Sequence, residues 1–507
     1  MQKILYNTDA RKDTLLGINK GADLIKITLG PKGRNVTIAK KYGDPIITND
    51  GVTIARNLHF SDGQIGLDFI KQVTEKSNDK AGDGTTTTTL LTQVMANEGS
   101  KYIEAGMNPT LFKHGMRDAK DRVIVELVKN SRSLKTRKEI AQVATISAES
   151  EEMGEMLADI ISDLGREAYI TIEEGGNSIT VKKVKGMSFD NGKLDDSLSD
   201  ELKNPYVYIT SKRIREASKI VEVLELADEK GATDVLFIAD DIEGEALDTL
   251  TSNHKRGVMN ISAVSVPGFG LEKNEIAQDI AIFTGSELND EIILFGKAEK
   301  VTLSKDSFVI IGGGGKKSSV SKRIKELKEQ KTDTTMEKEG IQRRLARFTS
   351  GVAVIEVGSP IPSDLVYLKH KVEDAVSATK SALEEGIVPG GGIALYHASG
   401  AITVPSGDVS YTSGYELVLK AIKSPVFQIL ENAGLNPHEI VAQFAGKSNV
   451  YGFDAFTGQY VKDMFKEGIT DPLKVTRTAL ENAVSIVSTV LTSGGSIIDY
   501  EDNTKEK

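Results

Sequence analysis

The stretch AGDGTTTTT at residues 81–89 is the most informative part of this chain. Asp83, a single carboxylate between two glycines, can hold a hard cation such as Mg²⁺. Gly82 and Gly84 have no Cβ, so the backbone can come close to a ligand there. The following residues are helical in pattern from about Leu90, which places the threonines at or just before a helix start. The unpaired N–H groups, the hydroxyls and the helix dipole favour a phosphate at such a point, although a threonine-rich cap explains the same letters equally well.

Composition describes an ordinary globular protein of several domains. A chain of 507 residues is too long for one core, and about two to four domains are expected. The net charge of −10 disfavours a nucleic-acid partner. The absence of cysteine excludes disulfides and thiolate metal sites and fits a reducing compartment. No apolar run approaches a membrane span and the first residues lack the apolar core of a secretory signal, so we expect a cytoplasmic protein with no membrane partner.

The two ends of the chain share a helical texture. Residues 1–130 are mostly helical in pattern and contain one short strand pair in NVTIAKKYGDPIITNDG, with the turn residues Gly43, Asp44 and Pro45. From residue 353 onward the helical pattern returns, broken by VPGGG and by the hairpin-like VYGFDAFTGQYV. A discontinuous helical domain with an insertion is therefore favoured.

The middle of the chain has a different pattern. Residues 131–184 begin with a charged helix and end in the strands AYITIEE and SITVKKVKG. Residues 185–352 alternate helices with the short strands VYIT, DVLFIAD, ISAVSV and SFVIIG, which is typical of an α/β unit. Two charged amphipathic helices across 320–348 close this part.

Several other segments could contribute to a phosphate or acid–base site. TLGPKGRNV at 28–36 can form an anion-binding nest or a plain helix stop, and the triplet Gly390–Gly392 can let the backbone approach a nucleotide or make a tight turn. An ordinary P-loop is excluded because its motif is absent. Asp50 at a strand end and Asp374 in KVEDAVSATK are the acidic candidates, and spacing does not show that they converge with Asp83. The six histidines lack metal-ligand spacing, so a structural role is favoured.

These motifs occur together, in order, in one known family. TLGPKGRNV, ITNDGVTIAR, NDKAGDGTTTTTLL, EAGMNP, ISAES, IEGEAL, PGFG, SGVAVIEVG, VEDAVSATKSALEEGIVPGGG and GITDPLKVTRTALENA resemble the group I chaperonins, the GroEL family, across nearly the whole chain. The resemblance implies an α+β multidomain fold. It implies a mainly helical equatorial ATP-binding domain (1–129 and 385–507), a small intermediate hinge domain (130–184 and 353–384) and an α/β apical domain that binds polypeptide and lid (185–352).

The resemblance also implies function and partners. Family members form homo-oligomeric rings, usually of seven subunits, that enclose non-native polypeptides under a co-chaperonin lid and are driven by ATP. Asp83 is implied as the Mg²⁺ ligand, Asp374 as the carboxylate that orients or deprotonates the attacking water, and Asp50 as its assistant. The remaining implied ATP contacts are Thr28, Leu29, Gly30, Pro31, Gly84, Thr85, Thr86, Thr87, Gly391 and Asp471.

Some positions near the nucleotide depart from the family. Asn49 stands where the family has a lysine, which we expect to alter contacts with phosphate or with a monovalent cation such as K⁺. Asp454, Ala455 and Phe456 replace Asn-Ala-Ala beside the adenine; Asp454 and Ala455 are kept as ATP-side residues.

The apical groove departs further. Family tyrosines become Lys193 and Ser197, a phenylalanine becomes Leu198, and two valines become Thr251 and Ser252, whereas Leu247 is kept. The preceding helix, near Ile220, Val223 and Leu224, stays apolar. Hydrophobic capture needs contiguous exposed apolar area, so we expect weaker or altered substrate and lid binding.

Subunit contacts and the C-terminal segment also differ. Ion pairs between subunits are replaced by Asn191 with Pro362 and by Phe427 with Asn436, and the ending SIIDYEDNTKEK is expected to be disordered.

Two functions stay open from sequence: an ATP-driven folding chamber, or a ring-forming ATPase that acts as a dedicated holdase, scaffold or regulatory partner.

Overall fold

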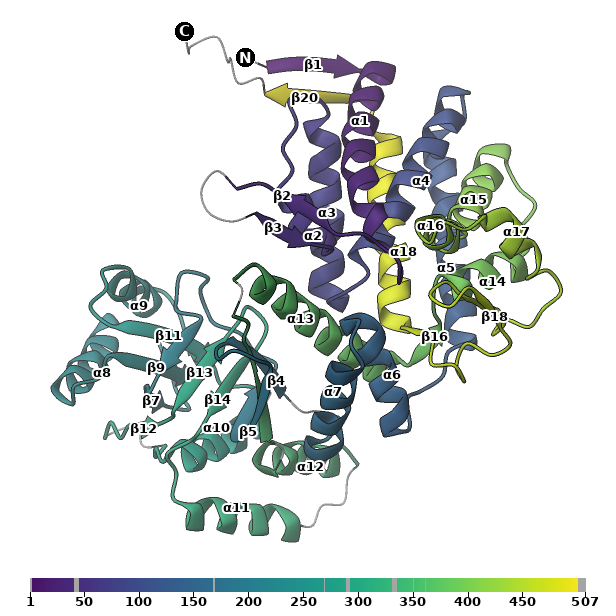
Figure 1. Cartoon of the computed structure of the whole chain (residues 1–507). Helices are drawn as coiled ribbons and strands as arrows, with labels where there is room; N and C mark the ends of the chain where they lie inside the picture. Colours follow the sequence, from purple (N-terminus) through teal and green to yellow (C-terminus); the bar gives the residue numbers. More distant parts are fainter. Residues whose placement is uncertain are drawn as a thin grey trace. The chain divides into compact units, whose positions relative to one another are not determined.

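The chain forms two compact units, each built from separate stretches of sequence. Unit 1 comprises residues 1–162, 176–178 and 357–507, and unit 2 comprises residues 163–175 and 179–356 (Figure 1). The computed structural model describes residues 2–40, 45–166, 169–268, 270–288, 292–330, 335–349, 351–360 and 362–499. The predicted turn residues Gly43 and Asp44 lie outside these ranges, whereas Pro45 lies within them.

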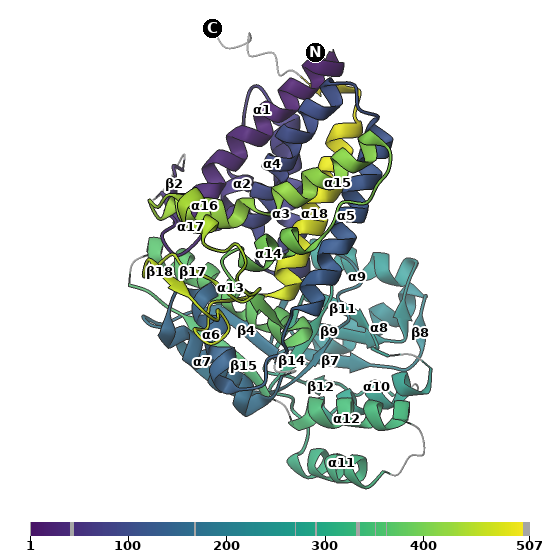
Figure 2. The ribbon, with the colours of Figure 1, turned by 90° about the vertical axis from the view of Figure 1, so that its right-hand side faces the viewer.

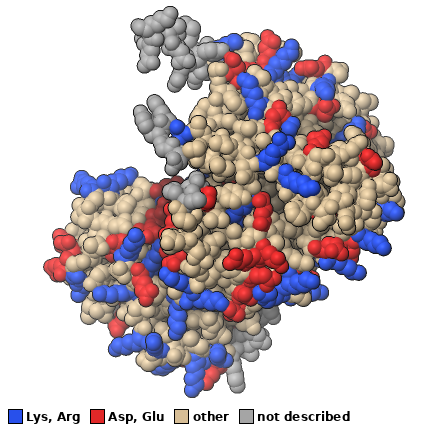
Figure 3. All heavy atoms as spheres, in the orientation of Figure 1, with Lys and Arg blue, Asp and Glu red and all other residues tan. Residues whose placement is uncertain are grey.

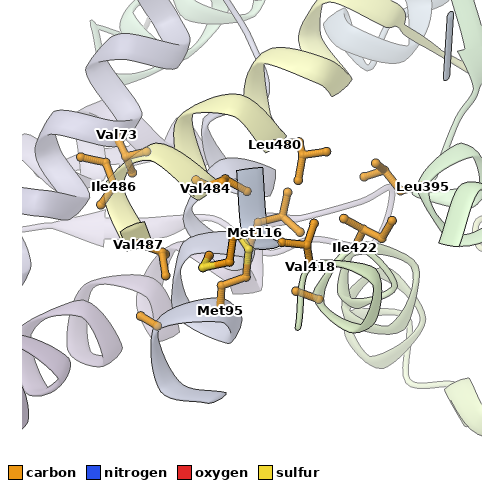
Figure 4. Close-up of a cluster of buried hydrophobic side chains, with 14 of the residues drawn as sticks. Val73, Met95, Met116, Leu395, Val418, Ile422, Leu480, Val484, Ile486 and Val487 are labelled. Atoms are coloured by element: carbon orange, nitrogen blue, oxygen red, sulfur yellow. The ribbon is translucent and has the colours of Figure 1, made fainter. Parts of the chain in front are cut away.

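Unit 1 is mainly a bundle of long helices. The bundle consists of α1 (Asn7–Ile25), α3 (Gln64–Ala81), α4 (Thr85–Glu104), α5 (Pro109–Lys129), α15 (Val409–Ala421) and α18 (Leu473–Thr492). α18 packs against α3, α4 and α5, and α15 lies along α5 (Figure 2). Apolar side chains from both ends of the sequence fill the interior, among them Met95, Met116, Val418 and Val484 (Figure 4). Their burial explains why the two helical ends of the chain form one unit.

Shorter elements surround this bundle. The helices are α2 (Gly51–Arg56), α6 (Arg137–Ala148), α7 (Glu151–Leu164), α13 (Pro362–Glu385), α14 (Ile393–Ala401), α16 (Ser424–Asn432) and α17 (Pro437–Ala442), with a 3₁₀ turn η1 (Lys26–Thr28). Four two-stranded antiparallel pairs complete the unit: β1 (Gln2–Tyr6) with β20 (Gly495–Asp499), β2 (Val36–Ile38) with β3 (Ile46–Thr48), β16 (Ile387–Pro389) with β19 (Thr470–Pro472), and β17 (Gly452–Asp454) with β18 (Gln459–Val461).

The described part of unit 2 contains a six-stranded sheet, a four-stranded sheet and a separate pair of strands, with helices around them. The six-stranded sheet has the order β4 (Tyr169–Glu174), β15 (Gly351–Val357), β5 (Thr180–Phe189), β14 (Phe308–Ile311), β13 (Lys300–Leu303) and β6 (Glu201–Lys203). The four-stranded sheet has the order β11 (Asn260–Ser265), β9 (Asp234–Ala239), β7 (Tyr206–Ile209) and β12 (Gly296–Lys297), of which β11, β9 and β7 are parallel. β8 (Arg213–Ile214) pairs separately with β10 (Asp241–Ile242).

The helices of unit 2 are α8 (Ala217–Glu229), α9 (Glu245–Lys255), α10 (Leu271–Thr284), α11 (Lys317–Glu329) and α12 (Thr335–Thr349). Strand β9 is buried on both faces, as a parallel strand between covering layers requires. On the face of the described residues in Figure 3, acidic and basic side chains are interspersed rather than gathered by sign.

The expected α+β multidomain class is confirmed, with a mainly helical unit and an α/β unit. The α/β unit comprises residues 163–175 and 179–356, because β4 and β5 belong to its six-stranded sheet. The predicted boundary of an apical domain at residues 185 and 352 stays a prediction. The separation of unit 1 into an equatorial and a hinge domain stays a prediction.

Two local expectations were wrong. The threonines lie at the start of α4, as predicted, but this helix begins at Thr85, five residues before the position expected from its apolar pattern. The C-terminal segment is ordered as far as Asp499, because β20 forms a five-residue antiparallel ladder with β1. The last residues, 500–507, lie outside the described part of the chain.

Candidate functional site

The loop between α3 and α4 exposes the start of α4. Gly82 and Gly84 adopt positive φ angles of 66° and 80°, which reverse the chain on either side of Asp83. Gly84 is the N-cap of α4, and no side chain caps the helix there. The first N–H groups of a helix have no partner within it, so those of the first turn are available to an anion. Within the described residues, the hydroxyls of Thr85 and Thr87 also make no hydrogen bond.

The threonines further into α4 have a different role. Thr88 and Thr89 donate their hydroxyl protons to the carbonyls four residues earlier, Gly84 and Thr85, at 2.8 and 2.9 Å. This bonding satisfies the hydroxyls inside the helix. Of the five threonines, the three at the helix start are therefore the ones placed to meet a ligand.

The predicted turn at Thr28–Pro31 lies beside this helix start. The Thr28 hydroxyl is 3.3 Å from that of Thr86. Gly30 has a φ of 87°, and a Cβ there would lie only 2.9 Å from a methyl carbon of Ile429 in α16. The Asn432 amide of α16 donates to the Leu29 carbonyl at 2.9 Å. The turn is thus held between α4 and α16.

Asp50 lies at the start of a second helix close to the first. It caps α2, accepting the Val52 N–H at 3.1 Å and the Thr53 N–H and hydroxyl at 2.9 and 2.6 Å. A Cβ added at Gly51 would lie 2.8 Å from Oγ1 of Thr85, so the two helix starts are adjacent. Both carboxylate oxygens of Asp50 already have partners, and its first role is that of an N-cap.

Helix α13 brings Asp374 to the same loop. The Ser381 hydroxyl of α13 donates to the Ala81 carbonyl at 3.0 Å. Ser377 packs so closely against Gly82 that a Cβ on this glycine would lie 2.2 Å from the serine Cβ. One face of α13 therefore docks on the loop that carries Asp83, with Asp374 one turn before Ser377.

Asp471 approaches from the β16–β19 pair. It lies opposite Val388 in the register, and its carboxylate accepts hydrogen bonds from the backbone N–H groups of Gly391 and Gly392. Gly390 lies against it, since a Cβ there would be 3.1 Å from its Oδ1. Gly390 thus has a steric reason to lack a side chain at this point, whereas a Cβ at Gly391 would meet nothing within 4 Å.

The electrostatics show that these acids share one region. Burial raises the pKa of Asp374 well above its ordinary value, and the charges of Asp83 and Asp50 raise it further. Burial, with the charge of Asp50, also raises the pKa of Asp83, while the Gly84 N–H and Lys371 oppose the rise. Burial and the charge of Asp83 raise the pKa of Asp471 to about 7. Such crowding of carboxylates favours a bound cation.

The donor set fits Mg²⁺ rather than a metal held entirely by protein. Among the described residues, no group of three or more His, Cys, Asp or Glu side chains could hold a metal ion. Mg²⁺ is usually bound by one or two carboxylates together with phosphates and water, and Asp83 beside an open helix start offers that arrangement.

The residues that were predicted to lie beside the adenine are near the Thr28–Pro31 turn. Ala455 is buried in a cluster with Ile393, and Leu29 packs against the same cluster. The Asp454 carboxylate accepts the Phe456 N–H at 2.8 Å and the Thr457 hydroxyl at 2.7 Å, which closes the β17–β18 hairpin. Asp454 is therefore partly committed to its own turn.

The predicted groove residues of unit 2 do not form one exposed strip. Leu198 and Ile220 are only 3% and 0% exposed and belong to the core under α8 and α9, so their assignment to a binding surface is wrong. Leu224 and Leu247 are partly buried against the same core. The remaining two are polar: the Thr251 hydroxyl donates to the Asp248 carbonyl at 3.1 Å, and Ser252 is exposed.

The substituted positions have local bonding roles. Lys193 donates to the Leu198 carbonyl at 2.8 Å and pairs with Asp200 at 2.6 Å, and Ser197 bonds to Asp195. Asn191 donates to the Ser265 carbonyl at 2.6 Å. In unit 1, the Phe427 ring packs against His438, and Asn436 caps α17. Pro362 is the first residue of α13.

Sequence reasoning missed three polar residues beside the aspartates. Ser147 donates to Oδ2 of Asp83 at 3.4 Å, and Lys371 contacts Glu149 at 2.7 Å while its charge acts on Asp83 and Asp374. One signal was available: Lys371 precedes Asp374 by three residues, which places both on one helix face.

Comparison with known proteins gives two matches of nearly full length. Residues 22–498 match the TCP-1/cpn60 chaperonin family. Among solved structures, the chain is similar to a crystal structure of the chaperonin gp146 from the bacteriophage EL 2 (Pseudomonas aeruginosa), determined in the presence of ATP-BeFx. The identity is 20%, the TM-score is 0.71, and the match covers 98% of this chain and 99% of that one. In the described residues, no helix is long and apolar enough to cross a membrane.

Proposed function

The chain belongs to the TCP-1/cpn60 chaperonin family, and we propose that it is an ATP-hydrolysing chaperonin. The observation that carries the proposal is the meeting of Asp83, Asp374 and the open start of α4 on one loop of unit 1. The similarity of the fold to a chaperonin studied with ATP-BeFx supports a nucleotide as the ligand. The motif resemblance to chaperonins is confirmed by the family match.

The site residues have complementary tasks in hydrolysis. The N–H groups and hydroxyls of Thr85–Thr87 and the turn Thr28–Pro31 would bind phosphate oxygens, while Gly391, Asp454, Ala455 and Asp471 would hold the base and ribose. Asp83 would hold Mg²⁺, which neutralises charge on the phosphates when bound.

Asp374 would direct the chemical step. A water attacks the γ-phosphorus, the bond to the bridging oxygen breaks, and ADP and phosphate leave. Asp374 would orient this water and accept its proton, with Asp50 supporting the helix start beside it. The raised pKa of Asp374 fits a group that takes up and returns a proton.

ATP turnover would drive a homo-oligomeric ring that encloses non-native polypeptides. Seven subunits per ring, a co-chaperonin lid, a K⁺ ion at the phosphates and a cytoplasmic location belong to this proposal and follow from the family resemblance. They predict a native mass that is a multiple of seven subunits and ATPase activity that responds to Mg²⁺ and K⁺.

A specific observation favours a second function. Two of the apolar groove candidates, Leu198 and Ile220, are core residues, and Lys193, which stands at a family tyrosine position, is bonded within its own loop. A groove with little exposed apolar area captures non-native polypeptides weakly. A ring ATPase serving as a dedicated holdase, scaffold or regulatory partner is therefore the alternative.

The hydrolysis assignment is tested with Asp374→Ala. We expect ATP turnover to fall at least about 100-fold while ATP still binds, because positioned proton transfer contributes that much. Asp364→Ala is the matched control, since Asp364 is an exposed carboxylate in the first turn of the same helix. Steady-state turnover of Asp374→Ala equal to that of the wild type would overturn the assignment.

A refolding assay separates the two functions. An aggregation-prone enzyme is refolded with this protein and ATP, with and without a lid protein. Recovered enzyme activity supports a folding chamber. ATP turnover with suppressed aggregation but no recovered activity supports the holdase.

A further inference from the structure

The carboxylate of Glu149, close to the loop that carries Asp83, accepts hydrogen bonds from three side chains. Glu149 follows α6 and has a φ of 53°, a left-handed conformation that is uncommon outside glycine. It accepts hydrogen bonds from Lys371 Nζ at 2.7 Å, the Asn49 amide at 3.2 Å and the Tyr367 hydroxyl at 3.4 Å. We call Glu149 and these three partners the Glu149 clamp. It joins the end of β3, the end of α6 and one face of α13.

The spacing along α13 places Asp374 between two anchors. Tyr367, Lys371, Asp374, Ser377 and Ser381 recur at intervals of three or four residues, so they lie along one helix face. The N-terminal part of this face is attached to the Glu149 clamp, and its C-terminal part docks on the Ala81–Asp83 loop. The place of the Asp374 carboxylate therefore depends on both attachments.

The charge of Lys371 reaches the reacting region as well. Only 8% of this side chain is exposed, and its ammonium charge acts on both Asp83 and Asp374. A buried ammonium is costly unless it is paired, and Glu149 supplies the pairing charge. The Glu149 charge therefore limits how strongly Lys371 offsets the charge of the aspartates.

We propose that Glu149 and Lys371 are positioning residues for ATP hydrolysis, which fix α13 so that Asp374 is held beside Asp83. This proposal rests on the assignment of Asp374 to the attacking water. A positioning residue touches neither the nucleotide nor the water, so its loss slows turnover and leaves ATP binding nearly intact. Lys371 additionally weakens cation binding at Asp83, because its charge has the same sign as that of the cation.

The kinetic test uses Glu149→Gln, Lys371→Met and Lys371→Arg in the full-length protein. We expect kcat to fall about tenfold in the first two with the KM for ATP within about twofold, since a misplacement of about 1 Å costs up to 100-fold. Lys371→Arg should recover most of the rate. Glu384→Gln is the matched control, because Glu384 also lies on α13 and forms a 2.6 Å ion pair, with Lys474.

The second readout is Mg²⁺ binding in the presence of ADP, measured by calorimetry. Lys371→Met removes a repelling charge, so we expect tighter Mg²⁺ binding. Glu149→Gln leaves Lys371 without its partner, so we expect weaker binding. A purely structural contact would not shift the two affinities in opposite directions.

The outcomes distinguish this proposal from the proposed function. Wild-type turnover in Asp374→Ala overturns the role of Asp374 itself. If Asp374→Ala is inactive while Glu149→Gln and Lys371→Met keep the wild-type kcat, the positioning role is wrong. The positioning role is also wrong if both variants lose melting temperature and ATP affinity and their Mg²⁺ affinities shift in the same direction. Tyr367→Phe, which removes only one hydroxyl from the clamp, extends the kinetic test if the stronger variants do not fold.

Discussion

At the residue scale, the absence of a Cβ at Gly82 determines how the loop that carries Asp83 packs. Gly82 has a positive φ, as many loop glycines do, but it also lies where the face of α13 docks. A residue with a Cβ would be strained there and would also displace Ser377. The AGDG motif thus needs its first glycine for packing as well as for backbone conformation.

Gly82→Ala is expected to lower ATP turnover at least about tenfold, because pushing α13 outward moves Asp374 away from the loop. Gly106→Ala is the matched control: Gly106 has a φ of 92°, but a Cβ there meets nothing within 4 Å. Both variants should lose about 1–2 kcal/mol from left-handed strain. Steady-state ATPase assays and thermal unfolding check the pair, and equal turnover in both would contradict the packing argument.

Asp471 makes stability depend on pH. Its carboxyl group holds a proton more tightly in the folded chain, with a pKa of about 7, than at the ordinary value of 3.8. Stability from this group is complete below the unfolded pKa and is lost as pH rises through about 7. We expect the free energy of unfolding of Asp471→Asn, minus that of the wild type, to be about 2 kcal/mol larger at pH 8 than at pH 5. This figure discounts the pKa shift because Asp471 is partly exposed. Denaturant unfolding without nucleotide measures this, and parallel pH profiles would contradict it.

At the element scale, the sequence predicted the strands of unit 2 well and the start of α4 poorly. Strands such as β9 are short apolar runs that are buried on both faces, so their pattern identifies them. The five threonines look unlike a helix because β-branched residues have low helix propensity. That turn is nevertheless helical, with Thr88 and Thr89 bonded back to the previous turn and Gly84 at the N-cap, and neither feature can be found from apolar periodicity.

The residues of the candidate site are likewise divided into those that the sequence predicted and those that it did not. Motifs predicted Asp83, Asp374 and Asp471 because these residues lie in recognisable local patterns. Glu149 and Lys371 are 222 positions apart, and no spacing rule indicates that they meet. The burial of Leu198 and Ile220 was missed for the complementary reason: an apolar residue in a helix or loop has the same letter whether it faces the core or the solvent.

Truncation of the chain can measure how much the β1–β20 ladder protects β1 from hydrogen exchange. Ending the chain after Gly494 removes β20 and leaves the β1 edge unpaired, whereas ending it after Asp499 keeps all five residue pairs. We expect hydrogen exchange of β1 to accelerate only in the shorter variant, since an unpaired strand has exposed N–H groups. Similar exchange of β1 in the two truncations would show that the ladder does not protect it.

At the scale of the whole molecule, both functions under consideration require the same ATP site and differ in unit 2. The residues proposed to bind the nucleotide lie within unit 1, and those predicted to form the groove lie within unit 2. Changes to the groove can therefore alter what the protein holds without altering the chemistry that drives it. This separation is why an ATPase assay alone does not choose between a folding chamber and a holdase, whereas refolding does.

The proposed ring should respond weakly to salt. Where chaperonin relatives have interfacial ion pairs, this chain has neutral residues, of which Asn191, Phe427 and Asn436 already bond or pack within their own units. Salt screens exposed charges over about 8 Å at physiological ionic strength, so contacts without ion pairs lose little as salt rises. We expect the same native mass by light scattering in 50 and 500 mM KCl with Mg²⁺–ADP present. Dissociation at the higher salt concentration would mean that other charged residues hold the subunits together.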